Sequence, residues 1–187
     1  MTKDVFFDTF LKLYPKNAKI PYVFKMPYSI ALLGGEMAET EHRLIGTSIS
    51  PDCYIGIRLC DSGRFYIRST DSNIMYECSR EQLSGYNENN WAKKIFLLLS
   101  RMSGSINING AEILFHSDCN RAEFRRYSMI TAYAFAEIFC SNLKSADMLG
   151  FISQEKTDYR ENALKLMTVN AEKNKIYYID KGVDKYE

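Results

Sequence analysis

The chain has 187 residues, of which 46% are hydrophobic and 25% charged, and its formal net charge is +1. This length corresponds to one domain or at most two small ones, and the composition is typical of a globular protein. Charges of both signs are mixed along the chain, so no basic patch argues for a nucleic-acid partner. No apolar run reaches the roughly 18 residues that a membrane helix requires, so no membrane span is expected.

The five cysteines are an odd number, and no two of them form a C-x-x-C pair. The pattern therefore favours neither a disulfide framework nor a zinc site. The first residues run directly into an amphipathic segment that contains an acid, and they lack the apolar core of a signal peptide. We expect a cytoplasmic protein whose thiols are free and mostly buried.

The first predicted element is a helix over 4–14, where aromatic residues recur at helical spacing and Asp4 can cap the start. Residues 22–33 follow as an apolar, β-prone segment that Pro27 interrupts. A proline inside such a segment indicates an edge strand, a bulge or a break between two strands.

Apolar and polar residues alternate clearly over 53–60 and again over 64–69, and a short turn separates the two segments. The alternation places Ile55 and Tyr54 on opposite faces of the first segment. Together the two segments predict a β-hairpin. A further strand is expected over 74–77.

Helical and strand patterns are mixed in the second half of the chain. Asn90 can cap the first of these helices, and the strongest helical pattern is that of 125–142. In order, we expect helix 91–102, strand 111–115, helix 125–142, helices 145–151 and 154–168, and strand 175–180. In this order, strands come first and strands mixed with helices follow. Such an order favours an α+β layer structure over an alternating parallel sheet.

An acidic cluster with one histidine follows a pair of glycines and consists of Glu36, Glu39, Glu41 and His42. Carboxylates accept hydrogen bonds from sugar hydroxyls, so the cluster could line a polar pocket for a hydroxylated ligand. The alternative is a solvated loop, which is what charged runs usually form.

Two further patterns lie near the strongest helix. Arg125 and Arg126 stand at its start, where guanidinium groups and helix amides could together bind phosphate; ordinary surface arginines are the alternative. His116 ends a strand three residues before Cys119, which would suit a cysteine hydrolase, but a buried thiol beside a turn is the more frequent explanation. No set of converging metal ligands is visible.

Several segments carry a resemblance to a known family. Residues 26–39 are similar to the motif A-P-G-R-V-N-L-I-G-E-H-T-D-Y, and residues 110–118 to G-F-D-x-x-x-x-S followed by Asp or Asn. The helix from Trp91 is similar to W-A/S-x-Y-x-x-G, and residues 177–180 to A-L-L-I-D. In order and spacing, the chain resembles the N-terminal lobe of the galactokinase branch of the GHMP kinases, and we expect the second lobe to be absent.

The resemblance implies a single domain over 1–187, with a mixed β-sheet and helices packed mainly on one face. The resemblance places Gly35, Glu36 and Ala38 where the family has the Glu, His and Asp that grip the sugar, so these ligands are changed. The candidate sugar contacts are Glu36, Glu39 and His42 of the acidic cluster, and Glu161 lies near the position of the catalytic aspartate. Mg-ATP would be the cofactor of an active enzyme, and no other cofactor or metal is implied. The implied nucleotide-binding residues are Ser117, Asp118, Arg125, Arg126 and Ser128.

The chain departs from the family where phosphate should bind. Ser29 stands where the family has an arginine beside the transferred phosphate. The family's glycine–serine loop corresponds to 120–129, which contains no glycine and retains only Ser128 of the serine run. Glu123 and Phe124 would oppose an anionic phosphate by charge and bulk. Phosphoryl transfer depends on positioning and charge stabilisation, so we expect little or no kinase activity.

Three functions are therefore open. The chain is a galactokinase-related protein with impaired catalysis that acts as a carbohydrate-related binding or regulatory module. Alternatively, it is an ATP-dependent sugar kinase with an atypical phosphate loop, or one subunit of a split kinase. The expected partners are a sugar ligand and either a second copy or a separate C-terminal lobe, with neither nucleic acid nor membrane.

Overall fold

The computed structural model describes residues 1–16, 19–33, 43–103, 107–118, 124–139 and 176–180. The chain divides into two compact units, one of Met1–Lys25 with Cys53–Asn142 and one of Met26–Asp52 with Leu143–Glu187. The helices predicted at 145–151 and 154–168 lie outside the described residues. None of the helices that are described is long and apolar enough to cross a membrane.

Helix α1 spans Lys3–Leu13. Its cap is Thr2, whose hydroxyl accepts a hydrogen bond from the Val5 amide at 3.4 Å, so the predicted cap at Asp4 is wrong. Asp4 lies instead in the first turn, where a negative charge is favourable to the helix dipole. The helix ends before Pro15, because a proline disfavours helical conformation in the residue that precedes it.

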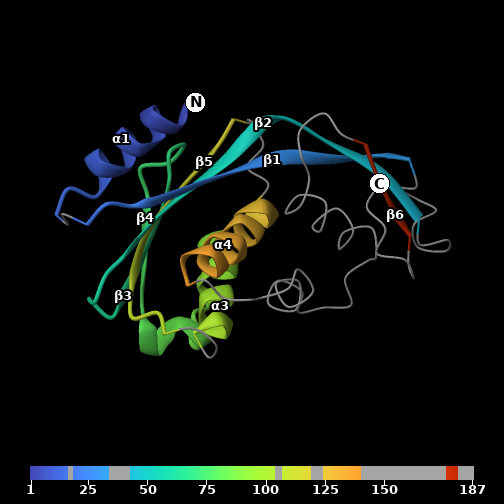
Figure 1. The fold of residues 1–187 in the computed structure, drawn as a ribbon. Coiled ribbons are helices and arrows are strands. Elements are labelled where there is room, and N and C mark those ends of the chain that lie inside the picture. The colour runs from blue at the N-terminus through green and yellow to red at the C-terminus, as the bar shows by residue number, and fades with distance from the viewer. Residues whose placement is uncertain (17–18, 34–42, 104–106, 119–123, 140–175, 181–187) are drawn as a thin grey trace. The chain divides into compact units, whose positions relative to one another are not determined.

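Six strands form one mixed sheet (Figure 1). They are β1 (Tyr22–Leu33), β2 (Arg43–Leu59), β3 (Arg64–Ser69), β4 (Met75–Ser79), β5 (Ala111–Ser117) and β6 (Ile176–Asp180). The strand order is β1-β2-β5-β3-β4, and β6 pairs with β2. β5 runs parallel to β3 and antiparallel to β2. Pro27 lies in β1, at one end of this order, which confirms the edge-strand interpretation.

The predicted hairpin of 53–60 with 64–69 is wrong, because β5 lies between these two strands. The turn after β2 passes over the start of β5, where the Cys60 amide donates to the Gly110 carbonyl at 3.0 Å. A Cβ atom at Gly110 would lie 2.6 Å from the Arg64 carbonyl oxygen, so the crossing requires glycine. In the same turn, Gly63 has a φ of 68°, which glycine adopts without steric cost.

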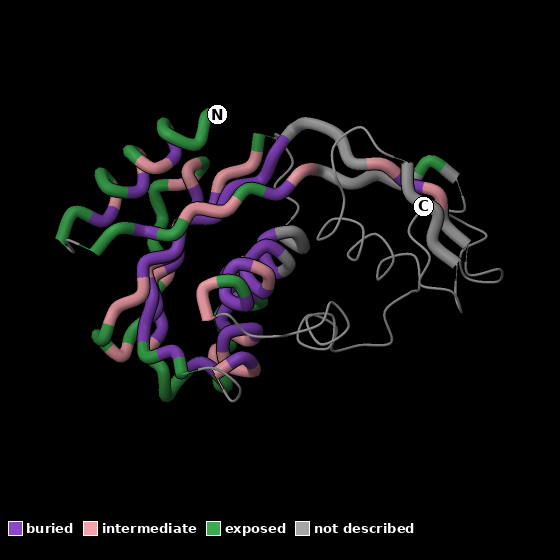
Figure 2. Tube along the Cα trace, in the orientation of Figure 1, coloured by how far each residue is buried: buried purple, intermediate pink, exposed green. Residues whose placement is uncertain are grey.

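The described helices lie on both faces of the sheet within the first unit (Figure 1). Helix α1 covers one face, and α3 (Ala92–Met102) and α4 (Phe124–Ile138) lie on the other, beside the 3-10 helix η1 (Arg80–Gly85). The N-cap of α3 is Trp91, one residue after the predicted Asn90, but the Asn90 side-chain oxygen still accepts from the Lys93 amide in the first turn at 3.1 Å. The α+β fold class is confirmed, and most of α3 and α4 is buried (Figure 2).

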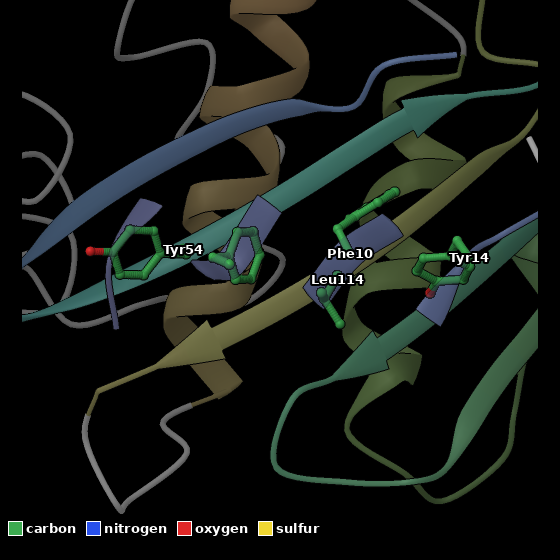
Figure 3. Close-up of a cluster of buried hydrophobic side chains, with 5 residues drawn as sticks. Phe10, Tyr14, Tyr54 and Leu114 are labelled. Atoms are coloured by element: carbon green, nitrogen blue, oxygen red, sulfur yellow. The ribbon is translucent and has the colours of Figure 1, made fainter. Parts of the chain in front are cut away.

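The pleat of the strands supplies each face with its own core. On one face, Leu114 and Tyr54 pack with Phe6, Phe10 and Tyr14 (Figure 3). On the opposite face, the neighbouring Phe115 stacks on Tyr127 of α4 with ring centroids 4.3 Å apart. The alternation of apolar residues in the central strands thus provides two hydrophobic layers, because successive side chains point to opposite faces.

Helix α1 is also attached to the sheet by a buried arginine. Arg58 in β2 is 1% exposed, and its Nε donates to Glu112 Oε2 of β5 at 2.6 Å. The same guanidinium donates to the backbone carbonyls of Tyr14 and Lys19 and lies over the Phe10 ring at 5.3 Å. A buried cation requires such a set of partners, and here they come from both the sheet and the end of the helix.

Candidate functional site

The carboxyl ends of the parallel strands β3 and β5 lie side by side. Ser69 of β3 is the register partner of Phe115 in β5. One residue further, the Thr70 amide donates to the Phe115 carbonyl at 2.9 Å. β5 then ends with His116 and Ser117, and Asp118 follows before the chain continues toward α4. The site is therefore built where β5 leaves the sheet.

His116 joins the two strand ends through both nitrogens of its ring. Nδ1 lies 2.6 Å from the Thr70 hydroxyl oxygen, and Nε2 lies 3.0 Å from Asp118 Oδ1. An ionised carboxylate can only accept a hydrogen bond, so the Nε2 that faces it carries a proton. In the neutral ring, Nδ1 then carries no proton and accepts a hydrogen bond from the Thr70 hydroxyl.

Asp118 is held by two donors. Its Oδ1 accepts from the Met1 amino group at 2.6 Å as well as from His116. Burial on its own would raise the pKa of Asp118, but the hydrogen bonds and charges of these donors outweigh it and lower the pKa below its ordinary value. The carboxylate is thus charged at neutral pH. The Tyr54 hydroxyl completes the group by donating to the Met1 carbonyl at 2.9 Å.

Aromatic side chains fix the first turns of α4 against the other face of the sheet. The Trp91 ring meets those of Phe115 and Tyr127 edge-on, at centroid distances of 5.8 and 5.4 Å. Burial raises the pKa of Tyr127 to about 12, although a hydrogen bond with Ser69 opposes the rise. The next residue, Ser128, is 8% exposed. This part of α4 therefore belongs to the core.

Of the site residues that the sequence predicted, the structure describes some in full, others only by their backbone, and others not at all. Ser117, Asp118 and Ser128 have the positions given above, at the end of β5 and in α4. For Arg125 and Arg126 only the backbone is described, in the first turn of α4. Those outside the described residues are Glu36, Glu39, His42, Cys119 and Glu161. The nucleotide- and sugar-binding roles thus stay predictions.

Sequence reasoning missed Thr70 as a partner of His116. The contact depends on the parallel pairing of β3 with β5, which joins residues 46 positions apart. Local alternation of apolar residues predicts a strand but does not predict its neighbour, so no signal in the sequence pointed to this pair. Among the residues described, no group of His, Cys, Asp and Glu side chains could hold a metal ion.

Neither a scan against protein-family models nor a search of curated proteins found a match to the sequence. Solved structures do match. Galactokinase from Lactococcus lactis, complexed with galactose, has a TM-score of 0.83 and 14% identity over 98% of this chain. Mevalonate kinase from Methanococcus jannaschii has a TM-score of 0.69 and 14% identity over 88% of it, and a sugar kinase from Campylobacter jejuni a TM-score of 0.59 and 13% identity over 87%.

These similarities confirm the predicted fold, which is that of the N-terminal lobe of galactokinase and other GHMP kinases. The chain covers 50% of the galactokinase chain and 55% of the mevalonate kinase chain, about half of each. At this level of identity, the matches establish the architecture, and activity has to be argued from the residues of this chain.

Proposed function

We propose that this chain is a galactokinase-related module that binds a sugar-type ligand and transfers phosphate poorly or not at all. The observation that supports ligand binding is the match to a galactose-bound galactokinase over 98% of the chain at a TM-score of 0.83. The absence of glycine from 120–129 supports weak phosphoryl transfer.

The argument against efficient phosphoryl transfer is steric and electrostatic. A phosphate loop needs small residues so that backbone amides can approach the triphosphate. Glu123 adds a negative charge and Phe124 adds bulk in the corresponding segment. Buried Tyr127 and Ser128 lie in the same segment. Loss of one positioned charge-stabilising group typically costs roughly a hundredfold in rate, and Ser29 replaces the arginine as well.

The sugar ligand is proposed to contact Glu36, Glu39 and His42 of the acidic cluster that follows the glycine pair. Isothermal titration calorimetry with galactose and related hexoses tests this proposal. We expect saturable binding that Glu36→Gln weakens at least tenfold. Glu137→Gln, which changes an exposed residue of α4, serves as the matched control and should bind as the unmodified chain does. Absence of binding to every hexose tested would contradict the proposal.

Catalysis is tested separately with Mg-ATP and the sugar that binds. We expect no turnover above background and no thermal shift with Mg-ATP alone. Turnover, together with a thermal shift that Arg126→Ala abolishes, would favour the alternative of an active kinase in which Arg125 and Arg126 replace the glycine loop and Glu161 is the base.

We also propose that the chain is a single lobe that lies in the cytoplasm and pairs with a second copy or a separate C-terminal lobe. The odd number of cysteines and the lack of any C-x-x-C pair in the sequence support a reducing compartment. Sedimentation equilibrium of the purified chain, with and without candidate C-terminal lobes, tests the pairing. A monomer under all these conditions would contradict it.

A further inference from the structure

Three side chains that contact one another have no part in the proposed sugar binding: Thr70, His116 and Asp118. We propose that they constitute a nucleophilic site, in which His116 activates the Thr70 hydroxyl toward activated acyl esters. The proposal is independent of sugar binding, and it gives Asp118, which the family resemblance assigns to nucleotide binding, a different role.

The geometry meets the requirements of a nucleophile, a base and a residue that orients the base. The Thr70 hydroxyl oxygen lies 2.6 Å from His116 Nδ1, and His116 Nε2 lies 3.0 Å from Asp118 Oδ1. Both distances fall within the range that joins nucleophile to base and base to orienting group in hydrolytic enzymes. Such a constellation recurs on unrelated folds, so the kinase-like fold does not argue against it.

The negative charge on Asp118 determines which tautomer the His116 ring adopts. A carboxylate that accepts from Nε2 leaves the lone pair of Nδ1 directed at the Thr70 hydroxyl. When Nδ1 takes the proton, the same carboxylate stabilises the imidazolium. The Asp71 carboxylate, at 3.4 Å from the Thr70 hydroxyl, is too distant to compete with Nδ1 for that proton.

The hydroxyls of two other threonines, Thr9 and Thr131, have a different environment. Thr9 donates to the Val5 carbonyl at 2.7 Å, and Thr131 donates to the Tyr127 carbonyl. Both hydroxyls donate to a backbone carbonyl of the preceding helical turn, and a carbonyl oxygen cannot act as the base that removes the proton. Thr70 is half-buried, and the His116 and Asp118 side chains are 13% and 24% exposed, so the group is partly open to solvent.

The reaction proceeds in two steps. The Thr70 oxygen attacks the carbonyl carbon of the ester while its proton moves to His116 Nδ1. The bond between the carbonyl carbon and the leaving alcohol then breaks, and the alcohol receives the proton from His116. The product is an acyl ester of Thr70. A water oxygen then attacks the acyl carbon while its proton moves to His116 Nδ1, the bond from that carbon to the Thr70 oxygen breaks, and the Thr70 oxygen receives the proton from His116 as the carboxylic acid leaves.

The test uses the full chain and p-nitrophenyl acetate as the probe. Release of p-nitrophenol gives the rate, and peptide mass mapping separates an acetyl group on Thr70 from acetylation of lysines and of the Met1 amine. We expect acetylation of Thr70, retained by Thr70→Ser and lost in Thr70→Val. His116→Gln should slow it at least tenfold, since a positioned base contributes roughly a hundredfold or more. Thr9→Val should leave the rate unchanged.

A purely structural hydrogen bond would give another result. In that case, Thr70→Val and His116→Gln lower the unfolding temperature, but no acetyl group appears on Thr70 of the unmodified chain. That outcome overturns the proposal, as does acetylation of Thr70 at the same rate in His116→Gln. Thr70→Ser keeps both hydroxyl and fold, so failure of this variant alone to react also counts against a nucleophilic Thr70.

Discussion

Arg58 and Glu112 are register partners across β2 and β5, and Arg58 Nε donates to Glu112 Oε2 at 2.6 Å. The side chains are only 1% and 14% exposed. Such a pair contributes to stability mainly because neither charge can be removed alone without leaving the other buried and unpaired. Since the same guanidinium also bonds the carbonyls of Tyr14 and Lys19, the pair determines how firmly α1 is attached to the sheet.

We predict that Glu112→Ala lowers the free energy of unfolding by about 3 kcal/mol, because it leaves a buried guanidinium without its charged partner. Urea denaturation measures the change. Glu77→Ala is the control, because Glu77 pairs with Arg64 at the surface and exposed pairs contribute about 0–1 kcal/mol. Equal effects of the two substitutions would show that the buried pair has no special role.

Gly56 allows α1 to approach β2 closely. A Cβ atom there would lie 2.6 Å from Phe10 Cδ2, and Phe10 is itself fully buried. We predict that Gly56→Ala lowers the free energy of unfolding by about 1–3 kcal/mol through overpacking. Gly85→Ala meets no atom within 4 Å and should be nearly neutral in the same urea titration. A neutral Gly56→Ala would mean that Phe10 can move aside.

Stability should fall at alkaline pH because of Tyr127. Its pKa is raised to about 12 in the folded chain, from about 10 in the unfolded chain. The stabilisation from the neutral phenol is therefore complete below about pH 10 and is lost as pH rises through the folded pKa. Urea midpoints at pH 9 and pH 11 measure the loss, and the loss should be smaller in Tyr127→Phe. An identical loss in this variant would assign the effect to other tyrosines.

At acidic pH, Asp118 has the opposite effect. Its pKa is lowered in the folded chain, so its contribution is present above the unfolded pKa of about 4 and is lost as pH falls through the lower folded value. We predict that Asp118→Asn reduces the drop in unfolding temperature between pH 6 and pH 3. Asp61→Asn changes an exposed carboxylate paired with Lys19 at 3.5 Å, and this variant should retain the full drop.

The sequence predicted individual strands and helices better than it predicted which strands lie side by side in the sheet. The alternation over 53–60 placed Ile55 and Tyr54 on opposite faces, and the structure confirms it, since Tyr54 packs against α1. The pairing of that strand was predicted incorrectly, because a short turn after it resembles a hairpin turn even where a later strand inserts. Hydrophobic alternation records which face is buried and contains no information on which strand lies alongside.

The same limit applies to the candidate site. His116 could be assigned to the end of a strand from the sequence, and it lies next to the last residue of β5, which ends at Ser117. The bond between Thr70 and His116 could not be predicted, since it follows from the parallel neighbours β3 and β5. The roles of Glu36 and Glu161 rest on the family resemblance alone and stay predictions.

The insertion of β5 between β2 and β3 has a consequence for biosynthesis. β2 and β3 leave the ribosome well before the strand that separates them, so each presents an unpaired edge until residue 117 has been made. Unpaired edges invite association between nascent chains. Closure of the sheet must then wait for a distant segment, and chains with such non-local pairings fold slowly. A chaperone that shields strand edges should therefore raise the yield of folded protein.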